Sequence, residues 1–138
     1  MASYTLNFQW CGNVDRLPQL SGIYFVYRAK LNRDNNTADV KELIYIGQSE
    51  NIYQRHHPHD RQADFDHQLQ KADDILCYAY CEHQLGETLD LIENGLIFKR
   101  QPRLNNNYKD SFNHNDTQFV LMGSAHDIMK DFTVYNLQ

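Results

Sequence analysis

The sequence is poor in cysteine, in long apolar runs and in positive charge. Its three cysteines, Cys11, Cys77 and Cys81, are too few and too scattered for a disulfide framework or a metal knuckle. We interpret them as small buried apolar side chains. No apolar run approaches the length of a membrane span, and the N-terminus lacks the charged-then-apolar pattern of a signal peptide. We therefore expect a cytoplasmic protein that makes no membrane contact.

Positive charge is scarce, because 13 Lys and Arg residues stand against 18 Asp and Glu residues, for a net charge of -5. Proteins that bind nucleic acid usually do so through Lys and Arg on phosphates, so this balance excludes a surface that is basic throughout. Any nucleic-acid contact must be local, or must be supported by a protein partner, by a second copy of the chain or by a divalent metal ion.

Apolar and aromatic residues are plentiful enough for a folded chain. The 138 residues are 41% hydrophobic and 12% aromatic, which is enough to bury a core and argues against disorder. We therefore expect residues 1–138 to form one domain.

Apolar periodicity divides the middle of the chain into elements in the order β-β-α-β-α. Strict alternation predicts strands, whereas recurrence every three or four residues predicts helices. The strands are expected at residues 22–27, 43–47 and 75–81, and the helices at residues 49–55, 60–72 and 85–100. This order predicts an α+β fold, with a small three-stranded antiparallel sheet flanked by helices and a core at about residues 21–107.

Both ends of the chain are expected to be additions to this core. Residues 1–20 are predicted to be an irregular arm with one short strand at 4–8. Residues 108–138 are predicted to be a C-terminal extension, with a strand at 118–122 and a short helix at 125–131. This extension is a candidate docking or recognition element.

Two tyrosines and one glutamate occupy special places in these elements. If the first two strands pair as a hairpin, one register puts Tyr24 and Tyr45 on the same side of the sheet. Alternation then puts Ile44 and Ile46 on the side opposite Tyr45. Glu93 lies roughly 70° around its helix from the centre of the apolar stripe, taking about 100° per residue. The glutamate is therefore expected at the rim of the core, next to a cleft.

Polar residues of these types suit phosphoryl transfer. Its transition state is crowded and negatively charged, and Arg55 can supply a planar, bidentate cation. One carboxylate such as Glu93 suffices for Mg²⁺, which keeps several of its waters. A tyrosine is a poor base at neutral pH unless cations lower its pKa, and Arg55, His59 and a metal ion could do so.

The sequence resembles the GIY-YIG nuclease family. Residues Gly22-Ile23-Tyr24 and Tyr45-Ile46-Gly47 are the pair of triplets that gives the family its name. An arginine lies ten residues after the second-strand tyrosine in that family, as Arg55 does here. A Tyr or His follows four residues later, where this chain has His59.

Two further motifs extend the resemblance to about residues 21–107. The family glutamate lies in a helical motif similar to Ile92-Glu93-Asn94-Gly95-Leu96-Ile97, and a Pro-x-x-Asn motif follows, here Pro102-Arg103-Leu104-Asn105. Either triplet alone would be weak, but the polar positions together are specific.

The resemblance implies roles for three residues around the attacking water. Tyr24 would activate or position the water, as general base in one version of the mechanism. His59 would relay or accept the proton, and Tyr45 would hydrogen-bond the water or the scissile phosphate.

The resemblance implies that three other residues act on charge and structure. Arg55 would stabilise the phosphorane, Glu93 would bind one Mg²⁺ or Mn²⁺, and Asn105 would hold the site together by hydrogen bonds. The implied activity is that of a metal-dependent endonuclease, with DNA favoured over RNA, that leaves a 5′-phosphate and a 3′-hydroxyl.

One departure from the family pattern is Gln48, since many members carry a lysine at this position after the second triplet. The candidate nucleic-acid contacts are Gln48, His56, His57, Arg61, Lys99, Arg100 and Arg103, with the two adjacent histidines expected at the surface. Two alternatives stay open. The chain could be a non-catalytic module that binds nucleic acid or a protein partner, or the catalytic subunit of a larger nuclease or homodimer.

Overall fold

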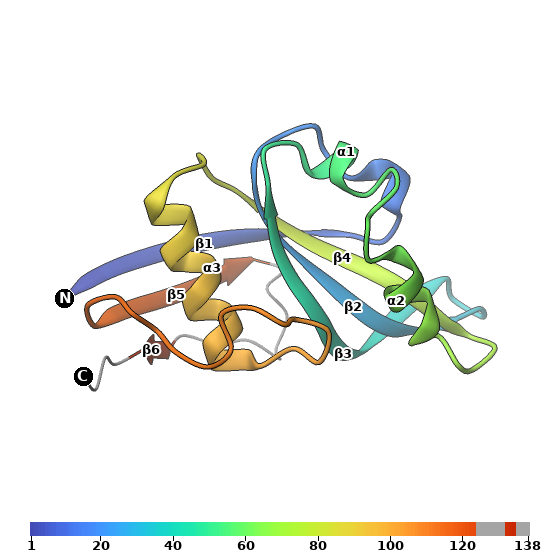
Figure 1. Cartoon of the computed structure of the whole chain (residues 1–138). Helices are drawn as coiled ribbons and strands as arrows, with labels where there is room; N and C mark the ends of the chain where they lie inside the picture. The colour runs from blue at the N-terminus through green and yellow to red at the C-terminus, as the bar shows by residue number, and fades with distance from the viewer. Residues whose placement is uncertain (124–131, 135–138) are drawn as a thin grey trace.

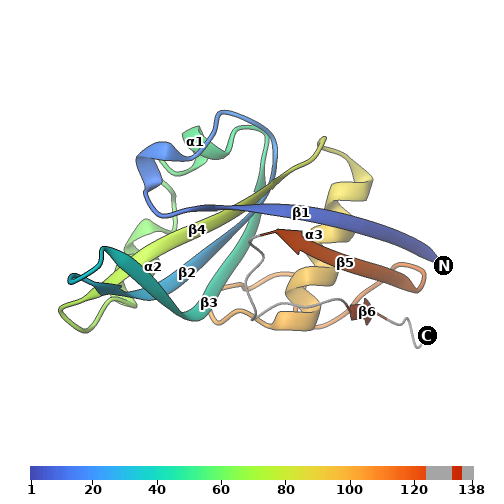
Figure 2. The same ribbon diagram turned by 180° about the vertical axis from the view of Figure 1, so that it is seen from behind.

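The structure, a computed structural model, describes residues 1–123 and 132–134 and is built around one strongly curled, mixed sheet (Figures 1 and 2). Five long strands form a half-barrel, and the short β6 extends its edge, in the order β3-β2-β4-β1-β5-β6. The strands are β1 (Ala2–Cys11), β2 (Gly22–Asn32), β3 (Thr37–Ser49), β4 (Asp74–Glu82), β5 (Thr117–Gly123) and β6 (Phe132–Val134). The helices are α1 (Ile52–Arg55), α2 (Gln62–His67) and α3 (Glu87–Arg100), with a 3-10 turn, η1 (Val14–Arg16).

The predicted α+β class is confirmed, but the predicted three-stranded sheet is wrong. The N-terminal arm is not irregular: β1 pairs antiparallel with β4 and parallel with β5, so both ends of the chain enter the sheet. Leu6 and Phe8 of β1 are buried, which explains why this segment extends the sheet. The parallel pairing with β5 joins residues more than a hundred positions apart, and local periodicity carries no signal for such a contact.

Each face of the sheet carries its own apolar core. On one face, α3 packs through Leu89, Ile92 and Leu96 against the strands. On the other face, the core under α1 and α2 contains Ile52 and Phe65. The edge strand β3 contributes to both cores, with Ile46 in the first and Ile44 in the second.

Helix α3 is held tightly and ends where the sequence predicts. Its last turn carries Lys99 and Arg100, which suit the negative end of the helix dipole, and Gln101 caps it in the left-handed conformation before a buried proline. Gly95 lets the helix come close to β5, since a Cβ there would lie 2.4 Å from the Phe119 ring. Helix α3 therefore has little freedom to shift Glu93.

A β-bulge in β3 changes which side chains face the site. Tyr45 pairs with Val26 and Leu43 pairs with Tyr27, so Ile44 has no partner on β2. Ile44 therefore packs in the same core as Tyr45, and the prediction that it faces the opposite side is wrong. Strict alternation holds only where no residue is inserted in the ladder.

Smaller differences concern the helices. Helix α1 begins later than the predicted helix at 49–55, after the N-cap Asn51, and α2 is shorter than the predicted helix at 60–72. The predicted strand at 118–122 is confirmed within β5, whereas the predicted helix at 125–131 lies outside the described residues. No helix in the described part of the chain is long and apolar enough to cross a membrane.

Candidate active site

Two tyrosines lie side by side on the face covered by α1 and α2. The rings of Tyr24 on β2 and Tyr45 on β3 have centroids 6.3 Å apart, which confirms the predicted shared face. Gly47 pairs with Tyr24 across the ladder, and a Cβ at this glycine would lie 2.4 Å from the phenol oxygen. The second triplet therefore supplies one of the tyrosines and the space that the other needs.

His59 contacts Tyr24 directly, and its tautomer follows from its neighbours. The His59 Nε2 atom lies 2.8 Å from the Tyr24 Oη atom. The backbone N–H of Arg61 donates to the His59 Nδ1 atom at 2.9 Å, so Nδ1 bears no proton. In a neutral imidazole the proton then resides on Nε2, which makes His59 the donor and Tyr24 Oη the acceptor. The hydroxyl proton of Tyr24 is left to point elsewhere in the site.

Burial keeps this histidine neutral. The pKa of His59 is lowered to about 3, chiefly by burial and then by the Arg55 charge. Asp60 approaches Nδ1 at 3.1 Å, which alone would favour a charged ring. The contact with Asp60 is not a hydrogen bond donated by Nδ1, because the Nδ1 lone pair already accepts the Arg61 N–H. At neutral pH, therefore, His59 donates a hydrogen bond to Tyr24 and is a weak proton acceptor.

Arg55 links the tyrosine to an acidic residue that the sequence did not indicate. Its guanidinium hydrogen-bonds the Tyr24 side chain and lies 2.8 Å from the Asp60 carboxylate. Burial raises the pKa of Tyr24 above its ordinary range, and Arg55 opposes that rise. The Tyr24 oxygen thus receives N–H groups from Arg55 and His59, an arrangement that stabilises a phenolate more than a phenol.

Glu93 on α3 interacts electrostatically with both tyrosines, and Asp90 lies about one turn before it on the same helix. Gln48 donates through its amide nitrogen to Asp90 at 2.7 Å and to Glu93 at 3.0 Å. Burial, with a smaller contribution from the Asp90 charge, raises the pKa of Glu93 to about 7. Beyond the effect of burial, the Glu93 charge raises the pKa of both Tyr24 and Tyr45. The carboxylate is therefore in electrostatic reach of both phenols.

Asn105 fastens the loop after α3 to the exposed edge of β3. Its side-chain oxygen accepts from the Ile46 N–H at 3.0 Å, and its nitrogen donates to the Ile46 carbonyl at 2.8 Å. The backbone N–H of Leu104 donates to the Ile44 carbonyl in the same way. The Asn105 side chain thus forms the pair of hydrogen bonds that a neighbouring strand would form with Ile46. The hydrogen-bonding role predicted for Asn105 is directed at the edge of β3.

The candidate nucleic-acid contacts are distributed unevenly. His56 is not at the surface as predicted: it is 4% exposed, and burial lowers its pKa to about 4. The Nδ1 atom of His56 hydrogen-bonds the Ile52 carbonyl. His57 is exposed, but its ring lies 3.0 Å from Asp15. Neither histidine is placed as a ready phosphate contact.

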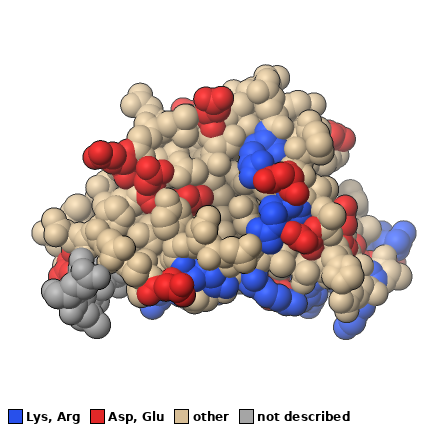
Figure 3. Space-filling model, in the orientation of Figure 1, with Lys and Arg blue, Asp and Glu red and all other residues tan. Residues whose placement is uncertain are grey.

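The predicted arginine contacts are also engaged within the protein. Arg61 pairs with Asp64, donates to the Leu104 carbonyl and lies over the Tyr45 ring. Arg103 pairs with Glu42. Figure 3 shows the face of the molecule that is toward the viewer in Figure 1. Basic groups near its centre have acidic neighbours, and further basic groups lie along its lower edge. Lys99 and Arg100 are exposed in the last turn of α3, where a phosphate could reach them.

The donor set fits a hard divalent cation but not a protein-only metal cage. Among residues 1–123 and 132–134, no group of three or more His, Cys, Asp or Glu side chains could hold an ion. Mg²⁺ needs only one or two carboxylates, because waters and substrate phosphates supply the other ligands. Glu93 and Asp90 offer that pair, and the pKa of Glu93 is raised chiefly by burial and in smaller part by the Asp90 charge.

The structure brings the six predicted catalytic residues into one region. It also places two carboxylates there, Asp60 and Asp90, that the sequence analysis did not predict. Asp60 follows His59 directly, and Asp90 lies three residues before Glu93, so it shares a helix face with the predicted ligand. Helical spacing could have identified Asp90. Asp60 lies in a turn, where no periodicity indicates direction.

Comparisons with protein-family models, with curated proteins and with solved structures find no match.

Proposed function

We propose that the protein is a divalent-metal-dependent endonuclease that cleaves nucleic-acid phosphodiester bonds with GIY-YIG-type chemistry. One observation carries the proposal: the buried Tyr24 oxygen receives N–H groups from His59 and Arg55. A phenol with two donors aimed at its oxygen is suited to carry negative charge during proton transfer. The proximity of Glu93 and Tyr45 completes a site with groups for water, phosphate and cation.

The side chains divide the work of hydrolysis. Tyr24 positions the attacking water through its hydroxyl, whose oxygen is held by the N–H groups of His59 and Arg55. To act as general base it would first release its own proton to solvent, and the same N–H groups would then stabilise the phenolate that takes a proton from the attacking water. His59 donates a hydrogen bond to Tyr24. This differs from the expectation from the sequence, in which His59 relays or accepts the proton. Tyr45, half-buried beside Arg61, places its hydroxyl for the water or the scissile phosphate. The Arg55 cation then offsets charge on the phosphorus oxygens.

Glu93, assisted by Asp90, would hold the Mg²⁺ or Mn²⁺ ion, and the ion would stabilise the charge on the leaving 3′ oxygen. Gln48 keeps the two carboxylates side by side through its amide. Where many GIY-YIG nucleases carry a lysine, this chain keeps a hydrogen-bond donor but no charge. The predicted products remain a 5′-phosphate and a 3′-hydroxyl, with DNA favoured as substrate.

A second candidate function is a non-catalytic nucleic-acid-binding module, and Gln48 is the observation in its favour. Its amide occupies both carboxylates that an ion would use. A protein in which this contact persists would bind nucleic acid without turnover. Cleavage and binding must therefore be measured on the same substrates.

The test is a cleavage assay with Mg²⁺ or Mn²⁺ on end-labelled single-stranded, duplex and branched DNA and RNA. We expect products with 5′-phosphate ends, and Glu93→Gln should lower the rate roughly 100-fold or more. Glu87→Gln is the matched control, since Glu87 is exposed in the first turn of the same helix. Binding without cleavage of any substrate by the folded protein would exclude the nuclease and leave the second candidate.

The role of His59 is tested in the same assay. His59→Gln retains an N–H for Tyr24, whereas His59→Ala retains none. If His59 is a donor, the glutamine variant should be at least about 10-fold more active than the alanine variant, which is the scale of one hydrogen bond to a charged group. Equal loss in both variants would return His59 to the role of proton acceptor.

A further inference from the structure

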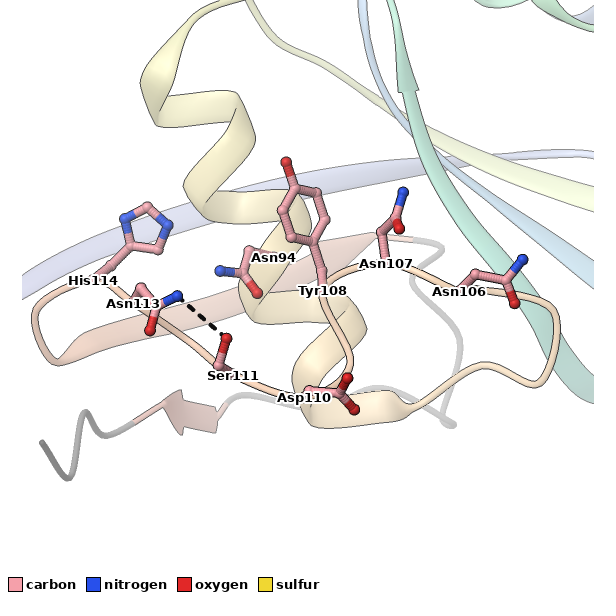
Figure 4. Close-up of a pocket in the computed structure, with 8 residues that line it drawn as sticks. All are labelled: Asn94, Asn106, Asn107, Tyr108, Asp110, Ser111, Asn113 and His114. Atoms are coloured by element: carbon pink, nitrogen blue, oxygen red, sulfur yellow. Dashed lines mark hydrogen bonds between the residues drawn. The ribbon is translucent and has the colours of Figure 1, made fainter.

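Beside the candidate active site lies a hollow between α3 and the loop at residues 106–114 (Figure 4). Its volume is about 530 Å³, within the range of roughly 300–1,000 Å³ that is usual for ligand sites. Asparagine is the commonest of its lining residues. Asn94, at its inner wall, follows Glu93 along α3, and Tyr108, another lining residue, interacts electrostatically with Glu93 and Asp90.

Asn94 is the buried polar anchor of this hollow. Its side chain points from α3 toward the loop, and the residue is only 4% exposed (Figure 4). The Oδ1 atom of Asn94 has no hydrogen-bond partner. Buried polar atoms in folded proteins are nearly always paired, so an orphan at a hollow points to a missing donor. An N–H group of a ligand would supply it.

Tyr108 provides an aromatic surface at the same place. It is 42% exposed, and its backbone has a φ of 65°, a conformation that a tyrosine rarely adopts. Burial and the charges of Glu93 and Asp90 raise its pKa, so the phenol stays neutral and lies near both carboxylates. A large, partly exposed ring held in a strained loop is a natural stacking surface.

The chemistry of the lining selects one class of ligand. Among the described residues that line the hollow none is Lys or Arg, and Asp110 is the one carboxylate, so a phosphate would find no cation. Neutral amides, a hydroxyl and an aromatic ring instead match a flat, neutral group with donors and acceptors on its edge. A nucleobase has this form, and an asparagine amide can pair with an adenine edge through two hydrogen bonds.

We propose that this hollow is a nucleobase subsite, in which Tyr108 stacks on one base of the substrate and Asn94 hydrogen-bonds its edge. The proposal rests on the proposed function, because it places the base next to the bond that Glu93 helps to cleave. A base stacked in a duplex cannot enter such a hollow. The substrate is therefore unpaired at this position, as in a single strand or a flipped nucleotide.

The test is fluorescence anisotropy with a labelled single-stranded DNA oligonucleotide and with the same oligonucleotide made fully abasic. Ca²⁺ replaces Mg²⁺ so that binding is measured without turnover. We expect the wild type to bind the intact strand about 5- to 100-fold more tightly, since stacking of one base is of this order. Tyr108→Ala should abolish the difference and Tyr108→Phe should retain it. Tyr80→Ala, which removes a tyrosine on β4 that hydrogen-bonds Gln9, is the control and should bind like the wild type.

The outcomes separate this proposal from the nuclease assignment. Equal affinity for both oligonucleotides, in a protein that cleaves DNA, would overturn the subsite alone. A preference for the intact strand that survives Tyr108→Ala would also overturn it. Preference lost with Tyr108→Ala, in a protein that never cleaves, would support the subsite and reject the nuclease.

Discussion

At Glu93, burial and the proposed metal-binding function make opposite demands on one carboxylate. Burial favours the neutral acid and raises the pKa from 4.5 to about 7, whereas a metal ligand must be charged. Asp90 adds to the conflict, and the Gln48 amide reduces it only in part. The site therefore holds Glu93 in a state that a cation would stabilise.

This conflict predicts a pH-dependent cost in stability. Below pH 4.5 Glu93 is protonated in the folded and unfolded states, and no penalty arises. As the pH rises from 4.5 to about 7, Glu93 loses its proton in the unfolded chain before it does so in the folded protein. The free energy of unfolding therefore falls over this range and stays lower above it. Glu93→Gln should therefore raise the free energy of unfolding by roughly 2–3 kcal/mol at pH 8 and hardly at all at pH 4.

Urea denaturation without divalent ions measures this difference. Added Mg²⁺ or Mn²⁺ should stabilise the wild type at pH 8 but not Glu93→Gln, since the ion binds the charged carboxylate. Glu87→Gln controls for loss of an exposed charge on the same helix. A stability difference that does not change between pH 4 and pH 8 would contradict the raised pKa.

Among the elements, β3 depends most on residues far away in the sequence. It is the edge strand of the sheet, and an unpaired edge invites pairing with other chains. Leu104 and Asn105 cover this edge at Ile44 and Ile46 with three hydrogen bonds. The loop after α3 thus fixes the strand that carries Tyr45.

Asn105→Ala should destabilise the protein by roughly 2–4 kcal/mol, because it leaves a buried N–H and a buried carbonyl of Ile46 without partners. Urea denaturation gives the magnitude. Asn106→Ala, at the exposed neighbouring position, should change stability by less than about 0.5 kcal/mol. Similar values for the two variants would mean that the edge contact contributes little.

For the whole molecule, charge is arranged in pairs. Arg55, Arg61 and Arg103 each contact a carboxylate, so the acidic chain presents few cations to a phosphate backbone. Lys99 and Arg100 are exposed in the last turn of α3. Binding should therefore depend weakly on salt, with contributions from only a few phosphate contacts.

The double variant Lys99→Ala/Arg100→Ala should weaken binding of all sequences alike. It should also lower the slope of log affinity against log salt by about 1–2. Anisotropy titrations across a range of NaCl concentrations give the slope. The control is Arg33→Ala/Lys41→Ala, which removes two cations at the hairpin, where Arg33 pairs with Asp73 and Lys41 with Asp39. An equal change in both double variants would indicate a general charge effect.

The sequence by itself determined the strands at 22–27 and 43–47, the long helix and the shared face of Tyr24 and Tyr45. These features follow from periods of two and of about 3.6 residues, which a single stretch of chain contains. The spacing of residue types also predicted that Tyr24, Arg55 and His59 lie close together, as they do in the structure.

Only the tertiary structure decided the extent of the sheet and the burial of His56. Each depends on a partner brought close by folding rather than on a pattern in the sequence. The β1–β5 pairing joins the two ends of the chain, and the pKa of Glu93 depends on burial and on Asp90. Periodicity describes one segment at a time, whereas pairing, burial and charge depend on what lies against it.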